Sequence, residues 1–430
     1  MTKTSDTLKV LSNKSFLGLW MSQVFSQFST NIVNFALIAK IYQITSSSAA
    51  VSLLVFWFAT PAVLLGILAG VYVDRWDRKK ILISINIIQA FLVLGYIFVG
   101  NNYILIYPIV FLYAACNQFF LPAEGAMIPT IIKKNLRVAA NSFYLFTTYV
   151  SFILGYALSG VLMLLWGKDF PFYLASFFLL GATVVVMAVP SDKKRALEFR
   201  KSQARKKFFD AVKSGLLFIK TNNKVLYSIS HLILVQIVLS ALIALGPSFV
   251  TQKLDTSVES ASFMLVAPVG IGVALGAFVL NKIKKRKNIL LYMRNGVIAS
   301  SFVLFIVSVL PRFGPGVKKA VIDVMHINIL SKMNLLLSTS TLIVFFGFFA
   351  AFIVIPAQTI IQNETNCDLR GRVFGLSSML VHVFSLFPLV VFGLLADLLS
   401  PSLVFALIAL IILLWSLFSQ YGVKKGLANA

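Results

Sequence analysis

Long apolar runs alternate with short polar segments along the whole chain. The runs at 224–250, 335–357 and 400–421 each hold about twenty or more residues with almost no charge. A helix rises 1.5 Å per residue, so roughly 20 apolar residues cross the hydrocarbon layer of a bilayer, which is about 30 Å thick. Backbone N–H and C=O groups find no water partner in lipid, and such runs therefore fold as helices. The pattern predicts an all-α membrane protein.

The alternation predicts twelve membrane-spanning helices. We place them at residues 15–42, 49–73, 79–99, 103–130, 138–165, 170–190, 224–250, 258–281, 288–310, 335–360, 372–397 and 400–421. The first apolar run is too long for the apolar region of a signal peptide, and no small-residue cleavage site follows it. We therefore expect that run to be the first span.

Composition agrees with this prediction and gives it an orientation. The 430 residues are 59% hydrophobic and only 12% charged, which is too apolar for a soluble domain. Of the 38 Lys and Arg residues, 31 fall on the side of the bilayer that holds both termini. The other side holds seven: Lys40, Lys168, Lys253, Arg312, Lys318, Lys319 and Lys332. Basic loops stay in the cytoplasm, so we expect a multi-pass protein of the cell membrane with both termini cytoplasmic.

The net charge of +24 would also suit a nucleic-acid-binding protein. Its one-sided distribution instead indicates topology and attraction to anionic membrane lipids. We therefore expect lipids as partners and no nucleic acid.

A charged segment at 191–223 divides the chain. It begins SDKKRALEFRKSQARKK, which cannot lie in hydrocarbon. Phe208, Val212, Leu216 and Ile219 then recur at helical spacing, which indicates an amphipathic helix on the cytoplasmic leaflet or a solvated linker with some helicity. The expected domains are a six-helix bundle at 1–190, the linker at 191–223 and a second six-helix bundle at 224–430.

The two halves repeat each other. Gly70–Lys80 follows the second span, and Gly276–Arg286 follows the eighth. Pro122-Ala123-Glu124 on the fourth span is echoed by Pro356-Ala357-Gln358 on the tenth. The second pair of matching segments lies farther apart along the chain than the first pair. An insertion at 311–334, on the outer side, accounts for this difference in spacing. Duplicated halves are an architecture typical of membrane transporters.

The loop GVYVDRWDRKKIL, Gly70–Leu82, resembles the signature loop of the major facilitator superfamily, roughly G-x-x-x-D-R-x-G-R-R/K. It departs at Asp77, where the family usually has Gly. Two further stretches, Asn117–Ile132 and Ile355–Gly375, resemble the multidrug and macrolide exporter branch. The resemblance implies the major facilitator fold, with twelve transmembrane helices in two pseudo-symmetric six-helix halves that transport by alternating access. It also implies a cytoplasmic gate, made by Gly70, Asp74, Arg75, Arg78, Lys79, Arg370 and Arg372.

Neutral amides form a stripe on the first span. Gln23, Gln27, Asn31 and Asn34 fall on one face of a helix, less than a quarter-turn wide. An inward stripe of this kind suits a cavity for an uncharged or weakly charged solute, or hydrogen bonds between helices without a ligand. The other residues that we expect in a substrate cavity are Asn117, Tyr144, Thr148, Gln236, Gln358 and His382.

Glu124 is the only acidic residue that these spans place well inside a helix. A carboxyl group in such a place can take up and release a proton as a cavity changes sides, which makes Glu124 the candidate for proton coupling. It could equally cap the break made by Pro122 or pair with a basic gate residue. Many relatives carry an acid on the first span, where this chain has Thr30 and Asn31. Antiporters also carry a Gly-Pro-x-x-Gly-Gly run on the fifth span, and here the proline is absent from Gly155–Gly160.

No motif indicates covalent chemistry or ATP use. The chain has no G-x-x-x-x-G-K-[ST] loop, no Ser/His/Asp grouping and no metal-ligand spacing. We therefore expect no enzyme activity, no metal and no cofactor. The sequence predicts a monomeric secondary transporter that exports a hydrophobic or amphipathic small molecule, drug-like or macrolide-like, in exchange for protons. A lysophospholipid flippase, a nutrient importer of the same fold and a non-transporting scaffold or sensor are the alternatives.

Overall fold

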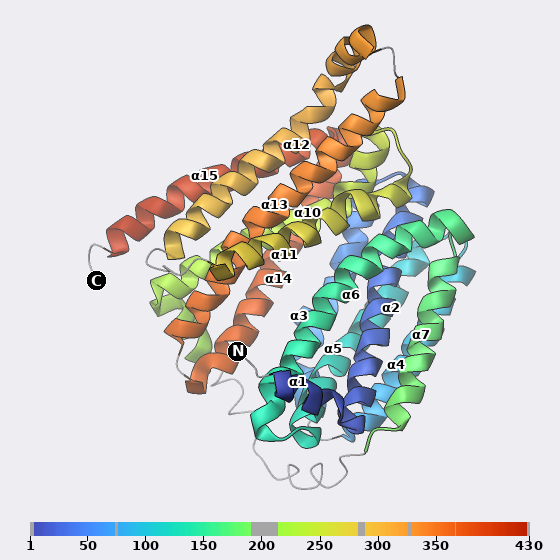
Figure 1. The fold of residues 1–430 in the computed structure, drawn as a ribbon, viewed down its shortest axis with the longest axis vertical. Coiled ribbons are helices and arrows are strands. Elements are labelled where there is room, and N and C mark those ends of the chain that lie inside the picture. The colour runs from blue at the N-terminus through green and yellow to red at the C-terminus, as the bar shows by residue number, and fades with distance from the viewer. Residues whose placement is uncertain are drawn as a thin grey trace. The chain divides into compact units, whose positions relative to one another are not determined.

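The structure is a computed structural model that describes residues 4–73, 76–190, 214–282, 289–325, 328–365 and 367–427. These ranges fold as helices and contain no strand (Figure 1). A short helix, α1 (Thr4–Leu11), is followed by the long helices α2 (Lys14–Thr45), α3 (Ser48–Val73), α4 (Arg78–Phe98), α5 (Ile106–Ile131), α6 (Arg137–Trp166), α7 (Phe170–Met187), α10 (Asn223–Lys253), α11 (Ala267–Lys282), α12 (Ile289–Met325), α13 (Asn328–Glu364), α14 (Cys367–Leu398) and α15 (Pro401–Leu427). A one-turn helix, η4 (Val258–Ser260), and a π-helical segment, η5 (Ser262–Val266), precede α11.

Each of the twelve predicted spans coincides largely with helical structure, and the eighth, 258–281, comprises η4, η5 and α11. In the described ranges, ten helices are long and apolar enough to cross a membrane by length and composition. The apolar part of α15, Pro401–Leu417, is shorter, and α2, which carries the stripe of amides, is not among the ten. The all-α membrane fold is therefore confirmed, and the arrangement is consistent with twelve spans.

The described parts of the insertion at 311–334, residues 311–325 and 328–334, are helical. α12 continues to Met325, and α13 begins at Asn328. By contrast, most of the predicted linker helix, including Phe208 and Val212, lies outside the described residues. From residue 214 to 221 the chain is helical. There Ile219 is buried against Val225 and Ile361, whereas Leu216 is exposed.

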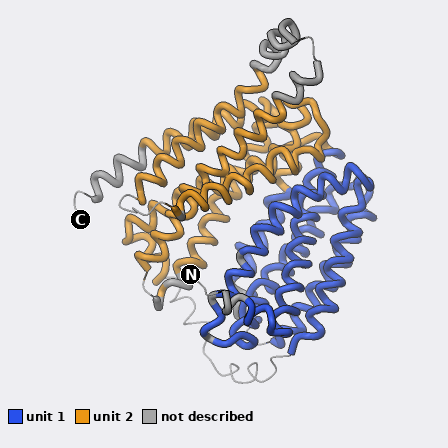
Figure 2. The backbone as a smooth tube through the Cα atoms, in the orientation of Figure 1, with its two compact units in different colours: residues 1–44, 54–204 blue, residues 45–53, 205–430 orange. Residues whose placement is uncertain are grey.

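The chain divides into two compact units, coloured separately in Figure 2. Unit 1 comprises residues 1–44 and 54–204. Unit 2 comprises residues 45–53 and 205–430, and so it includes the first turns of α3.

Serine hydroxyls join the helices of unit 1. Ser29 of α2 donates to the carbonyl of Ala175 on α7 at 2.9 Å, and Ser176 of α7 donates to the carbonyl of Ala90 on α4 at 3.2 Å. Lipid supplies no hydrophobic force between helices, so small residues and such hydrogen bonds hold membrane bundles together. This core fixes the position of α2, which carries the amide stripe.

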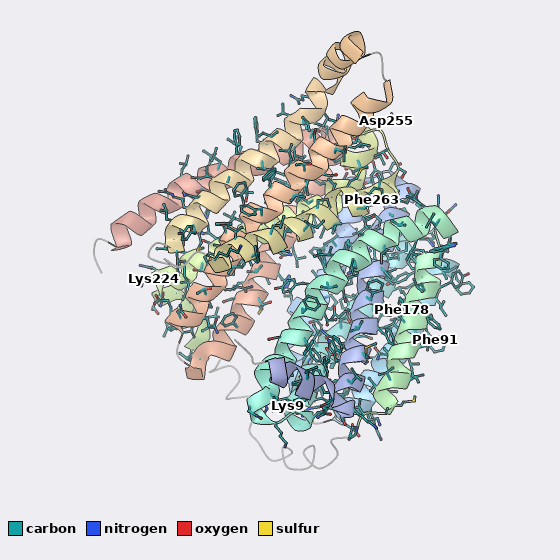
Figure 3. All side chains as sticks on the ribbon, in the orientation of Figure 1. Lys9, Phe91, Phe178, Lys224, Asp255 and Phe263 are labelled. Carbon is teal, nitrogen blue, oxygen red and sulfur yellow. The ribbon has the colours of Figure 1, made fainter. Side chains whose placement is uncertain are left out.

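Aromatic side chains divide between the inside and the outside of unit 1. Phe178 of α7 stacks on Phe25 of α2, with ring centroids 5.7 Å apart and planes within 10°, and meets Phe28 edge-on. Phe91 of α4, in contrast, is 68% exposed and projects outward (Figure 3). An outward apolar face is what a helix in contact with lipid tails requires.

Glycines bring the helices of unit 2 into close contact. A Cβ atom at Gly272 of α11 would overlap the backbone carbonyl of Val344 on α13, and one at Gly347 of α13 would overlap that of Val269. The absence of side chains at both positions lets the two backbones touch. α13 also packs along α12, so it forms the centre of this three-helix layer.

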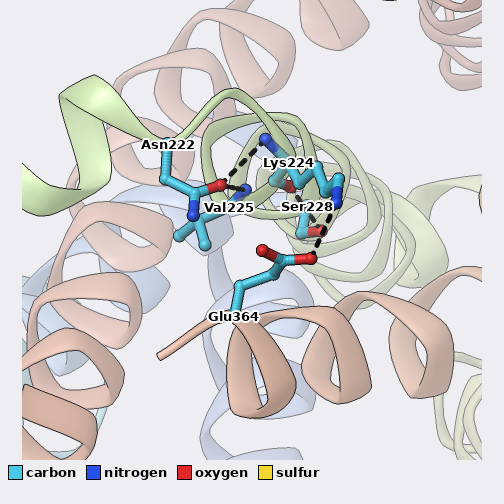
Figure 4. A network of polar contacts seen from close by, with 5 residues as sticks. All are labelled: Asn222, Lys224, Val225, Ser228 and Glu364. Atoms are coloured by element: carbon cyan, nitrogen blue, oxygen red, sulfur yellow. Dashed lines mark hydrogen bonds and ion pairs between the residues drawn. The ribbon is translucent and has the colours of Figure 1, made fainter. Parts of the chain in front are cut away.

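A polar network fixes the start of α10 against the end of α13 (Figure 4). The Asn222 side chain accepts hydrogen bonds from the N–H groups of Lys224 and Val225, both at 3.1 Å, and thereby caps the helix. The Lys224 ammonium group lies 3.0 Å from a carboxylate oxygen of Glu364. The Ser228 hydroxyl donates to the carbonyl of Lys224 at 2.8 Å.

Candidate functional site

The amide of Gln23 lies buried in unit 1, where α2 meets α6. Its nitrogen donates to the Tyr144 carbonyl and to the Thr148 hydroxyl oxygen, both at 3.2 Å. Its oxygen is buried and has no hydrogen-bond partner among the described residues. The Trp20 indole on the same helix donates to the Thr147 hydroxyl at 2.7 Å. α2 therefore presents a line of polar contacts to α6.

Glu124 of α5 reaches the same region. Its side chain is only 3% exposed, and within the described part of the chain one carboxyl oxygen has no hydrogen-bond partner. The carboxyl group interacts electrostatically with the phenol of Tyr144, whose buried hydroxyl is also unpartnered there. The structure thus brings together three sequence-predicted residues, Gln23, Glu124 and Tyr144, from α2, α5 and α6.

The rest of the amide stripe makes contacts within the bundle. The Asn31 side chain donates to the Gln27 carbonyl at 2.7 Å, one turn earlier. Asn31 also packs so closely on α6 that a Cβ at Gly155 would lie 2.6 Å from its own Cβ. Asn31 therefore serves packing in this conformation, and Gln27 and Asn34 are half-buried.

Two buried amides of α4 were missed by the sequence analysis. Gln89 donates to the Asn117 side chain at 2.9 Å and to the Tyr113 carbonyl at 3.2 Å. Asn86 is fully buried, and neither atom of its amide has a partner in the described residues. Two amides three residues apart inside an apolar span were the signal that could have identified them.

The described gate residues bind helix ends within unit 1. Asp77, the departure from the family loop, caps α4 by accepting from the N–H groups of Lys79 at 3.0 Å and Lys80 at 3.4 Å. The Arg78 guanidinium donates to the Ala126 carbonyl at 3.1 Å. The Lys79 ammonium donates at 2.6 Å to the carbonyl of Met187, the last residue of α7. Cations suit the carbonyl end of a helix.

The other predicted gate residues are less well described. Gly70 lies in α3, and Arg370 and Arg372 lie in α14. Asp74 and Arg75 lie wholly outside the described residues.

The candidates in unit 2 lie on three different helices. Gln236 of α10 donates to the Ser240 hydroxyl at 3.4 Å. Gln358 of α13 is exposed, and His382 of α14 is half-buried. A residue not proposed from the sequence, His231 of α10, is fully buried, and its Nδ1 lies 2.8 Å from the Tyr227 carbonyl. Over the described ranges, no group of three or more His, Cys, Asp or Glu side chains could hold a metal ion.

The chain matches the Major Facilitator Superfamily over residues 19–318. The uncharacterized MFS-type transporter YfiS of Bacillus subtilis (strain 168) is 25% identical, over 96% of this chain and 94% of YfiS. The putative bacilysin exporter BacE of the same organism is 28% identical, over 50% of this chain and 52% of BacE. Macrolide efflux protein A of Streptococcus pyogenes is 22% identical, over 48% of this chain and 51% of the efflux protein. The match covers about half the length of BacE and of the macrolide efflux protein. It also covers about half the length of YkuC of Bacillus subtilis (strain 168).

A solved structure confirms the fold. The crystal structure of a mutant of the nucleoside transporter NupG superposes with a TM-score of 0.72 at 13% identity, over 94% of this chain and 99% of NupG. Together with the helical architecture and the signature loop, the match over residues 19–318 shows that this membrane protein belongs to the Major Facilitator Superfamily.

Proposed function

We propose that this protein is a secondary active transporter that exports a hydrophobic or amphipathic small molecule in exchange for protons. The observation that carries the proposal is the buried carboxyl group of Glu124, one oxygen of which has no hydrogen-bond partner among the described residues. An ionised carboxylate in such a place lacks compensation for its lost hydration. A neutral, protonated Glu124 is therefore favoured while the site is closed, and opening to water allows the proton to leave.

Two relatives support export as the direction of transport. BacE is described as a putative exporter of bacilysin, and the streptococcal relative as a macrolide efflux protein. The nucleoside transporter NupG shares only the fold, so it supports no substrate for this chain. Export of a macrolide-like or drug-like compound is therefore the proposal.

Transport in this proposal proceeds by alternating access of the two halves, 1–190 and 224–430. The distribution of Lys and Arg supports cytoplasmic termini in the cell membrane. The loop that contains Asp74, Arg75 and Arg78 would close the cytoplasmic side. Gln23 and Thr148, which already share a hydrogen bond at 3.2 Å, would contribute polar groups to the substrate cavity. The transporter would act as a monomer among membrane lipids.

Proteoliposomes with an imposed pH gradient test the coupling. The probes are radiolabelled erythromycin, a macrolide, and ethidium, an amphipathic cation. The Glu124→Gln variant keeps the volume of the side chain but cannot release a proton. We expect its gradient-driven transport to fall at least tenfold, while erythromycin binding to the purified protein is retained.

The matched control is Glu259→Gln, the same change in the short helix η4. It should transport as the wild type does. Gradient-driven transport by the Glu124→Gln variant at the wild-type rate would contradict the coupling role. Wild-type protein that moves neither probe would contradict the proposed substrate class.

The same vesicles separate the alternatives. A lysophospholipid flippase would move a fluorescent lysophospholipid between leaflets but neither probe. A nutrient importer would accumulate its solute in the opposite direction. A scaffold or sensor would move none of these compounds in either direction.

A further inference from the structure

Unit 2 contains an apolar groove on its surface between α12 and α15. It encloses about 690 Å³, within the range of roughly 300–1,000 Å³ that is usual for ligand pockets. Its walls are the exposed side chains of Phe302 and Phe305 on α12 and of Leu407 and Leu410 on α15. None of the residues predicted to line the substrate cavity borders this groove.

The groove is as long as one leaflet of a bilayer is deep. It runs from Asn295 to Phe305 on α12 and from Leu413 to Leu403 on α15. Ten residues at 1.5 Å each give about 15 Å, which is half of the roughly 30 Å of hydrocarbon. Because the apolar span of α12 begins at Ile289, six residues before Asn295, the groove lies in the middle of that span, and an acyl chain within it extends past the membrane midplane.

The floor of the groove is apolar. Its one hydroxyl, on Ser301, donates to the Ala409 carbonyl at 2.6 Å and thereby joins α12 to α15. With this hydroxyl satisfied, the middle of the groove offers no hydrogen bond to a ligand. It suits a hydrocarbon chain rather than a polar solute.

A cation stands at one end. The Arg294 Nε donates to the Asn295 side-chain oxygen at 3.2 Å, which holds the guanidinium at the mouth of the groove. Arg294 lies five residues, or about 7.5 Å, from the first residue of α12, so its long side chain can extend to the headgroup level. The other N–H groups of the guanidinium are free for a phosphate, and the described residues place no carboxylate within 4.0 Å of them.

We propose that this groove binds one anionic phospholipid, with an acyl chain between α12 and α15 and its phosphate on Arg294. Arginine binds phosphate through paired N–H donors. The cation at the mouth favours an anionic lipid over a helix from a second copy of the chain.

Native mass spectrometry of the delipidated, detergent-solubilised protein tests the site. The probes are dioleoylphosphatidylglycerol, which is anionic, and dioleoylphosphatidylcholine, which is zwitterionic. We expect the wild type to retain one molecule of the anionic lipid in preference to the zwitterionic one. Arg294→Gln should bind the anionic lipid about tenfold more weakly, which corresponds to about 1.4 kcal/mol.

Two further variants make the test specific. Arg312→Gln removes an exposed arginine of the same helix beyond the far end of the groove and should bind as the wild type does. Ala406→Phe should displace the acyl chain and abolish retention of the lipid. If the Ala406→Phe protein does not fold, Ala299→Phe on the opposite wall of the groove, in α12, serves the same purpose. Equal retention of both lipids, or unchanged retention in Arg294→Gln, would overturn the proposal, as would a dimer peak that Ala406→Phe removes.

Discussion

The carboxylate of Asp397 accepts a hydrogen bond from the backbone N–H of Ser48 at 2.6 Å. It also accepts from the N–H of Ala49 at 3.0 Å and from the Ser47 hydroxyl at 2.5 Å. Ser48 begins α3, and Asp397 stands one residue before the end of α14. A residue 349 positions away therefore caps the first turn of α3, where a negative charge is favoured. Both residues belong to unit 2, which includes residues 45–53.

We predict that Asp397→Ala lowers the melting temperature of the purified protein. The loss combines a helix cap, about 1 kcal/mol, with a charge at a helix N-terminus, about 0.3–1 kcal/mol. Asp397→Asn keeps an acceptor but no charge, so its effect should be smaller. Ser47→Ala removes one of the three donors and also the hydroxyl oxygen that accepts from the Ala50 N–H at 3.1 Å, so it should lower the melting temperature as well. An Asp397→Ala protein that melts with the wild type in detergent would show that the cap is dispensable.

A second prediction concerns Lys40 of α2. Its ammonium donates to the Tyr96 carbonyl in the last turn of α4 at 2.7 Å and lies 3.4 Å from the carboxylate of Asp169. The lysine side chain is 13% exposed, but that of Asp169 is 47% exposed. A charge-assisted hydrogen bond contributes about 1.5–3 kcal/mol, whereas an exposed ion pair contributes about 0–1 kcal/mol. Lys40→Ala should therefore destabilise unit 1 more than Asp169→Asn, as measured by thermal unfolding. A larger destabilisation by Asp169→Asn than by Lys40→Ala would show that the ion pair, rather than the hydrogen bond to Tyr96, is the main contribution of Lys40.

The glycine contacts of unit 2 give a third prediction. Gly272→Ala places a methyl group against the Val344 carbonyl, which cannot move without α13. Overpacking of this kind costs about 1–3 kcal/mol, so we expect a lower yield of monodisperse protein and a lower melting temperature. Gly95→Ala on α4 is the control, because no atom of a neighbouring helix in the described residues lies within 4 Å of its added Cβ. That change should be neutral or should stabilise by up to about 1 kcal/mol. Equal behaviour of the two variants would contradict the close approach.

A fourth prediction concerns the Tyr144 hydroxyl, which interacts electrostatically with the Glu124 carboxyl group but forms no hydrogen bond with it. Tyr144→Phe removes a buried hydroxyl that has no hydrogen-bond partner in the described residues. It keeps the aromatic ring, whose centroid lies 6.0 Å from that of Phe16. If the hydroxyl stabilises the ionised carboxylate during proton release, gradient-driven export should slow several-fold, while melting stays unchanged. Tyr149→Phe on the exposed face of α6 serves as the control. Identical transport by the two variants would separate Tyr144 from the proton step.

Hydropathy was sufficient to predict the helices because the cost of burying backbone in lipid is a property of each segment alone. The predicted span at 170–190, for example, corresponds to α7, Phe170–Met187. The same reasoning placed the end of the ninth span at residue 310, although α12 continues to Met325. Hydropathy shows where lipid ends, and a helix can extend beyond that point into water.

The contacts of the candidate site depend on several segments at once, so the sequence could identify residues but not their partners. The stripe from Gln23 to Asn34 was visible as a helical face, yet Asn31 packs against Gly155 on another helix. Glu124 could be recognised as the single acid inside a span, but its unpartnered oxygen could not. Likewise, no local pattern predicts that Asp397 caps α3, because the two lie hundreds of residues apart.

The contact between α11 and α13 restricts how this chain can diverge. At Gly272 and Gly347 the opposite backbone occupies the place of a side chain, so no exchange of neighbouring side chains can accommodate a substitution. A change at either position requires the displacement of a whole helix. We therefore expect descendants of this sequence to keep both glycines while their specificity changes elsewhere, which makes this contact a fixed reference for comparing the family.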